Sequence, residues 1–232
     1  MTDAPSDPIG KPPTSGKRPQ RQQRPPAARP APNARPAREV NPVLEKLFEL
    51  HPQLFGAQFL PLKLGIFQDL LARHPEVFKK DELKIAMGQH ARSTRYLESV
   101  AAGHPRHDLD GKPLEAVAPE HVHHAILEIF RRRQLRSKED LKPRLVSRLV
   151  EAIDTSGLTP EDYAERVRVQ DEATNALLDE AISEFRLIAA RREALARTFT
   201  ASGKTVAEFA DMYGMNAADV SRALQAVKAP AA

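Results

Sequence analysis

Cysteine is absent from this 232-residue chain, as is tryptophan, and aromatic residues make up only 5% of it. Without cysteine the protein can form neither a disulfide nor a thiolate metal site, and such a composition is typical of a reducing cytoplasm. No apolar run approaches the roughly 20 residues that cross a bilayer. The N-terminus also lacks the apolar segment of a signal peptide. We therefore expect a cytoplasmic protein with no membrane partner.

Signatures of an enzyme are missing as well. The sequence has no glycine loop that would cradle a phosphate and no nucleophile paired with a base. His121, His123 and His124 lie close together, but nothing nearby completes a metal site. We expect no catalytic activity, no metal and no cofactor. A helix surface with one partly packed histidine is the simpler interpretation of these three residues.

The chain does carry a surplus of positive charge, which is unevenly distributed. Its 35 Lys and Arg residues exceed its 31 Asp and Glu residues. Residues 1–40 hold eight cations, three acids and ten of the twenty prolines, whereas acids outnumber cations in 137–232. A proline-rich stretch of this kind cannot bury enough apolar surface to offset its ordering entropy. We expect 1–40 to be a disordered basic arm, which either contacts phosphates loosely or serves only as a solubilising tail.

Residues 41–136 show apolar residues at helical spacing, so we expect a mainly α domain there. Asn41-Pro42 is typical of a helix start, and the apolar stripe that follows it includes Phe48. Asp110-Gly111 predicts one small β-hairpin. The other expected helices are one from Leu62 that buries Leu64, one over 81–90 with Ile85 among its apolar residues, one from Ser93 or Thr94 to Gly103, and one from Pro119 that ends in an arginine-rich turn.

The start of the helix at Ser93 or Thr94 has the components of a phosphate site. Either hydroxyl can cap the helix, and the free backbone N–H groups of the first turn attract anions. Arg92 and Arg95 add two guanidinium groups within the same turn. Lys63 would also suit an anion at a helix start, although a surface lysine without a role explains it equally well. The arginines near residue 133 fit either a solvated helix end or RNA contact.

An internal repeat with an offset of 46 residues fills most of 137–232. Residues 149–181 match 195–227, and each copy reads as a helix, an SGxT turn, a short helix and a further helix. The last two helices of each copy resemble a helix-turn-helix. A DNA reader needs base-contacting donors on its second helix, and they are few here. A packing or protein-interaction module is the favoured interpretation, with DNA readout and accessory RNA contact left open.

The segments PLKLGIFQDL, KKDELKIAMGQHARSTRYL, RHDLDGKP and EHVHHA together resemble the FinO/ProQ family of RNA chaperones. The resemblance covers roughly residues 42–133. It implies a compact helical domain over 41–136 that binds RNA, namely terminator-type hairpins with a single-stranded 3′ uridine tail. It also implies a role in post-transcriptional regulation by small RNAs and mRNA 3′ ends. The alternatives are a DNA-binding transcriptional regulator and a protein-recruiting adaptor, each acting through 137–232.

The resemblance also implies which residues contact RNA. Gly88 departs from the family pattern, because a cation can stand at that position, and Gln89 or Arg92 would have to replace it. Tyr96 has a second interpretation as a half-buried core residue. Taken with the residues of the helix start, the candidate RNA-binding residues are Lys63, Lys80, Lys84, Arg92, Ser93, Thr94, Arg95, Tyr96 and Arg106.

Overall fold

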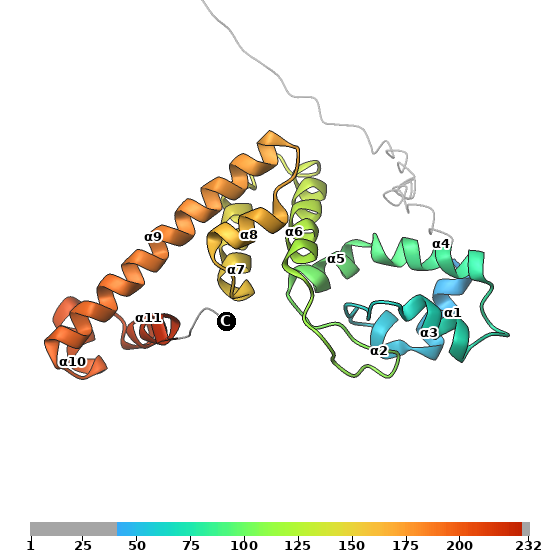
Figure 1. The fold of residues 1–232 in the computed structure, drawn as a ribbon, viewed down its shortest axis with the longest axis horizontal. Helices are drawn as coiled ribbons and strands as arrows, with labels where there is room; N and C mark the ends of the chain where they lie inside the picture. The colour runs from blue at the N-terminus through green and yellow to red at the C-terminus, as the bar shows by residue number, and fades with distance from the viewer. Residues whose placement is uncertain (1–40, 229–232) are drawn as a thin grey trace, which may run out of the picture. The chain divides into compact units, whose positions relative to one another are not determined.

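The computed structural model describes residues 41–228, which lie within one compact unit. The basic arm expected over 1–40 falls outside the described residues. The fold is mainly α, as expected from the sequence (Figure 1). No helix in the described part is both long enough and apolar enough to cross a membrane. The helices are α1 (Pro42–Leu50), α2 (Pro52–Phe55), α3 (Ile66–Arg73), α4 (Lys80–Ala91), α5 (Thr94–Ala101), α6 (Pro119–Gln134), α7 (Lys142–Ser156), α8 (Pro160–Val167), α9 (Glu172–Ser202), α10 (Val206–Tyr213) and α11 (Ala217–Lys228).

The first hydrophobic core, here called the N-terminal cluster, lies among α1 to α4. Asn41 caps α1 by accepting a hydrogen bond from the backbone N–H of Val43 at 3.0 Å, as the sequence predicts. Amphipathic helices of this length depend on tertiary packing for stability. The buried members of this cluster are Leu47, Leu54, Phe55, Leu62, Ile66, Leu70, Phe78, Leu83 and Leu109.

Two expectations within this region are wrong. The helix expected from Leu62 begins only at Ile66, and Leu64 is 66% exposed instead of buried. The reason is that Leu62 forms a bridge with His107, and the N–H of Lys63 donates to the carbonyl of His107 at 2.9 Å, which holds this segment extended. Ile85, expected on the apolar side of α4, is 58% exposed because Leu83 and Ala86 fill the buried face.

The segment around Asp110-Gly111 forms a tight turn with only isolated bridges beside it. Within 41–228 no regular strand is present, and His107 pairs with Pro113 in a single antiparallel bridge. The Asp108 carboxylate accepts hydrogen bonds from the N–H groups of Asp110 and Lys112 at 2.9 and 3.0 Å. These side-chain bonds fix the turn. The first arm of the turn pairs with the second arm, and the backbone of His107 in that first arm also bonds to Pro61 and Lys63.

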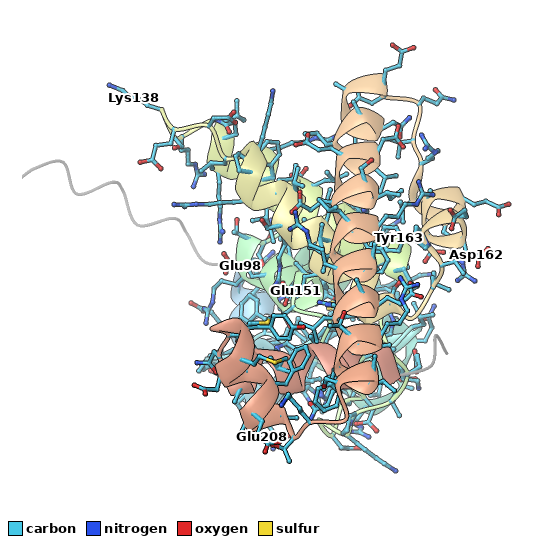
Figure 2. All side chains as sticks on the ribbon, turned by 90° about the vertical axis from the view of Figure 1, so that its left-hand side faces the viewer. Glu98, Lys138, Glu151, Asp162, Tyr163 and Glu208 are labelled. Atoms are coloured by element: carbon cyan, nitrogen blue, oxygen red, sulfur yellow. The ribbon has the colours of Figure 1, made fainter. Side chains whose placement is uncertain are left out.

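The second core, here called the central cluster, extends from Leu97 to Ile182 and is formed mainly by α5 to α9. Tyr163 of α8 lies at its centre with only 1% of its surface exposed, and Figure 2 labels it. Tyr96 is half-buried and packs against both clusters. The domain boundary expected after residue 136 lies between α6 and α7. Both of these helices contribute residues to the central cluster.

The two repeat copies share one helix. The first copy runs from α7 through α8 into the start of α9, and the second from the end of α9 through α10 to α11. Gly157 and Gly203 both follow a helix with positive φ, 68° and 62°, a conformation that favours glycine. Thr159 and Thr205 then cap helices of eight residues each. Figure 1 shows α9 as one continuous helix whose C-terminal end carries α10 and α11.

Candidate nucleic-acid interface

Three of the candidate residues meet at Leu62. The backbone N–H of Leu62 donates to the hydroxyl of Tyr96 at 3.2 Å, and its carbonyl accepts from the guanidinium of Arg106 at 2.9 Å. Lys63 follows directly and its ammonium lies 2.7 Å from the Asp69 carboxylate. That hydrogen bond raises the pKa of Lys63. The extended Leu62 segment thus brings residues from three separate stretches of sequence to one place.

Arg106 is unusual among these cations because it is only 9% exposed. Besides Leu62, its guanidinium lies 3.2 Å from the imidazole of His121 and 3.9 Å from the Glu115 carboxylate. A buried charge needs such partners to offset its desolvation. Arg106 therefore holds the turn segment and the Leu62 segment in position, and little of its own charge is available at the surface.

The start of α5 has the geometry of an anion site. Ser93 is the N-cap, and its hydroxyl accepts from the N–H of Tyr96 at 3.2 Å. Thr94 and Arg95 of the first turn are exposed, as is Arg92 just before it. Because the first-turn N–H groups of a helix lack intrahelical partners, an anion can bind there. Of the two possible caps predicted from the sequence, Ser93 is the one used.

A pocket of about 590 Å³ opens beside this helix start. Phe48, which is 51% exposed instead of packed inward, lines it together with Phe59, His90, Ser93 and Arg95. The guanidinium of Arg95 lies 4.5 Å from the centre of the Phe59 ring, a cation–π contact. Aromatic faces next to cations are the combination that unpaired nucleotides bind.

Lys80 and Lys84 lie one turn apart on α4, and both are exposed. Neither takes part in an ion pair within residues 41–228, so both charges face solvent freely. Gly88 follows one turn later, where a Cβ atom would lie 3.2 Å from the guanidinium of Arg92. Arg92 thus covers the position from which a side chain at residue 88 would extend.

The sequence did not identify Arg132 as part of this site. Its guanidinium donates to the carbonyl of Arg92 at 2.8 Å and to the hydroxyl of Thr94 at 3.3 Å. Glu128 lies 2.8 Å away on the same helix. The contact joins residues 38 or more positions apart, so no local pattern could reveal it. The only signal was the run of arginines at the end of α6.

Comparison with known proteins assigns a family to part of the chain. Residues 37–142 match the family model described as ProQ/FINO family. This part of the chain is a FinO/ProQ domain. Over 87 residues the chain is 42% identical to the RNA chaperone ProQ of Shewanella oneidensis and 41% identical to that of Aeromonas salmonicida. Each match covers 36% of this chain and 41% of the relative, so the chain spans about two fifths of these relatives' length.

A solved structure is also similar to the FinO/ProQ domain. It is the crystal structure of a FinO-like RNA chaperone from Neisseria meningitidis, with 30% sequence identity and a TM-score of 0.33. The match covers 36% of this chain and 85% of that one. The repeat copies after residue 149 lie beyond the part of the chain that the family model matches.

Proposed function

We propose that the chain is an RNA-binding protein that acts as an RNA chaperone in the cytoplasm and is not an enzyme. Its RNA would be a terminator-type hairpin with a single-stranded 3′ uridine tail, as found in small RNAs and at mRNA 3′ ends. The single observation that carries this proposal is the start of α5, where Ser93, Thr94 and Arg95 lie beside an aromatic pocket. The family of residues 37–142 supports it independently.

Each component has a role in holding such an RNA. A-form RNA hides its base edges, so proteins grip its backbone and bind its unpaired ends. Lys80 and Lys84 would contact backbone phosphates of the stem. The first turn of α5 would hold the 3′-terminal phosphate groups, with Tyr96 and Phe59 next to the last nucleotide. Arg106 would act indirectly, because it holds the Leu62 segment against Tyr96.

The test compares two RNAs that differ only in the chemical group at their 3′ end. One hairpin with a uridine tail would end in a free 3′-hydroxyl and the other in a 3′-phosphate, and both would be titrated with the full chain. We expect the 3′-phosphate to weaken binding about tenfold or more, because it adds bulk and charge where the terminal ribose fits. Equal affinities would reduce the site to a general basic surface and contradict the proposal.

Recruitment of a protein through the second repeat copy is a further candidate function. Met212, Tyr213 and Met215 are between 40% and 53% exposed, and large exposed apolar side chains that lie together often mark a protein contact. DNA readout by the first copy is disfavoured because its second helix opens with DEATNALLDEAI, which has four acids and no cation to contact phosphates or base edges. Co-purification with and without Tyr213→Ser would test recruitment; identical sets of bound proteins would contradict it.

A further inference from the structure

A groove of about 360 Å³ lies among α5, α6 and α7, at some distance along α5 from its capped start. Its apolar lining includes Ile129 and Leu145, which are almost fully buried. Arg133, Arg144 and Arg148 line it as well. Seven of the ten lining residues belong to the FinO/ProQ domain, and the other three are on α7, most of which lies beyond residue 142.

Arginine side chains from α6 and α7 contact α5 along its whole length. Arg132 reaches Thr94 at the start, and Arg133 lies 2.7 Å from the Glu98 carboxylate one turn later. Arg148 donates to the carbonyl of Ala101 at the end of the helix, at 2.9 Å. Eight helical residues span about 12 Å. The groove and the anion site at the start of α5 therefore lie along the same short helix.

The charges in the groove favour an anionic occupant. Three arginines face one acid of the lining, Glu98, and Arg148 also pairs with Glu151 at its outer side. Figure 2 labels both of these acids. The pairs are exposed, and exposed ion pairs are weak enough for a phosphate to replace the carboxylate. Arg144 has no ion pair or side-chain hydrogen bond to any described residue, so its charge is unopposed.

We propose that this groove binds an unpaired nucleotide of the same RNA whose 3′ end the start of α5 holds. The base would enter the apolar hollow, and its flanking phosphates would contact Arg144 and the neighbouring arginines. Apolar surface beside arginine is a sequence-tolerant way to bind single-stranded RNA. The inference rests on the proposed function and extends the RNA surface onto a helix outside the family domain.

The first experiment measures the affinity of the full chain for a tailed hairpin at several salt concentrations. Arg144→Ala should weaken binding about three- to tenfold, and the slope of log K against log salt should become less steep by about 0.7, the value for one phosphate of a single strand. Arg197→Ala is the matched control, because Arg197 is an exposed arginine on α9 whose side chain is 74% exposed. That variant should bind like the parent.

The outcomes separate the two proposals. If the parent chain does not bind the RNA, the proposed function fails. If the parent binds and Lys84→Ala weakens it, but Arg144→Ala behaves like Arg197→Ala, only the groove proposal is overturned.

A second measurement locates the occupant directly. A benzophenone amino acid replacing Leu141, a half-buried residue of the groove lining, should crosslink to an unpaired nucleotide. A crosslink confined to the stem would overturn the proposal, as would no crosslink to RNA. A crosslink to a protein with none to RNA would assign the groove to a different partner and would equally overturn it.

Discussion

Each of the two hydrophobic clusters buries one histidine against one tyrosine, and the two pairs differ in how far the tyrosine is buried. In the central cluster His123 lies 3.1 Å from the Tyr163 hydroxyl, and both residues are almost fully buried. In the N-terminal cluster His90 is packed against Tyr96 with ring centres 5.0 Å apart, but Tyr96 is only half-buried. The first pair lies between α6 and α8 and is almost fully buried, although Tyr163 lines a hollow of about 310 Å³, whereas His90 of the second pair lines the pocket beside the start of α5.

The difference separates a structural polar pair from a binding site. In the central pair, Nδ1 of His123 and the Tyr163 hydroxyl bond to each other, Nε2 of His123 is buried without a partner among the described residues, and almost none of either side chain is exposed to solvent. The N-terminal pair leaves an aromatic edge, a capped helix start and the guanidinium of Arg95 around one opening. The same residue types thus serve stability in one core and, in our proposal, RNA binding in the other.

The largest loss of stability should come from truncating Tyr163, the almost fully buried tyrosine. Tyr163→Ala should lower the free energy of unfolding by about 3–5 kcal/mol, the range for deleting a large buried aromatic ring. Urea denaturation followed by circular dichroism would measure it. Tyr96→Ala is the comparison variant and should lower stability clearly less, since Tyr96 is half-buried. Equal losses for the two variants would show that both pairs are structural.

Acid should destabilise both clusters through their histidines. Burial lowers the pKa of His90 to about 4 and that of His123 to about 4, against 6.5 for the unfolded chain. Between these values the unfolded state binds more protons, so stability is full above pH 6.5 and is lost as the pH falls toward 4. The total loss approaches about 3 kcal/mol for each histidine.

Unfolding midpoints measured at pH 7.5 and pH 5 would test this dependence. His90→Phe should reduce the difference between the two pH values, because phenylalanine fits among Phe55, Phe59 and Tyr96 and does not titrate. His104→Phe at an exposed position is the matched control and should leave the difference unchanged. An unchanged pH dependence in the His90 variant would mean that His90 is accessible to protons in the folded state.

Much of this comparison could be predicted from the sequence. Local sequence patterns are enough to predict four features: the Asn41 cap, the Ser93 cap, the helical fold and the resemblance of residues 42–133 to a family. The exposure of Leu64 and Phe48 could not be predicted, because it depends on where distant segments pair. Nor could the sequence distinguish the two tyrosines, since burial is set by the helices that cover them.

For RNA affinity, unlike for stability, we expect a larger loss from changing Tyr96 than from changing Tyr163. Tyr96→Ala should weaken binding of a tailed hairpin about tenfold, because stacking on an aromatic ring is worth roughly 1–3 kcal/mol per base. Tyr163→Phe keeps the ring and removes only the hydroxyl, so it should leave RNA affinity unchanged while lowering stability by about 1 kcal/mol. Fluorescence anisotropy at a temperature where all variants are folded would measure this. Tight binding by Tyr96→Ala would remove Tyr96 from the site.

The smallest effect concerns Gly88, where the sequence predicts a departure from the family pattern. Arg92→Ala should weaken RNA binding only a few-fold and should reduce the salt slope by about 0.7 to 0.9, which corresponds to one phosphate contact. A Cβ at Gly88 would point at the space that the Arg92 guanidinium occupies. Gly88→Lys in the Arg92→Ala background should therefore restore both affinity and slope. Gly88→Gln is the control, because it gains the same helix propensity, up to about 1 kcal/mol, without charge. Equal rescue by glutamine would mean that α4 stability, and not a cation at this place, governs binding.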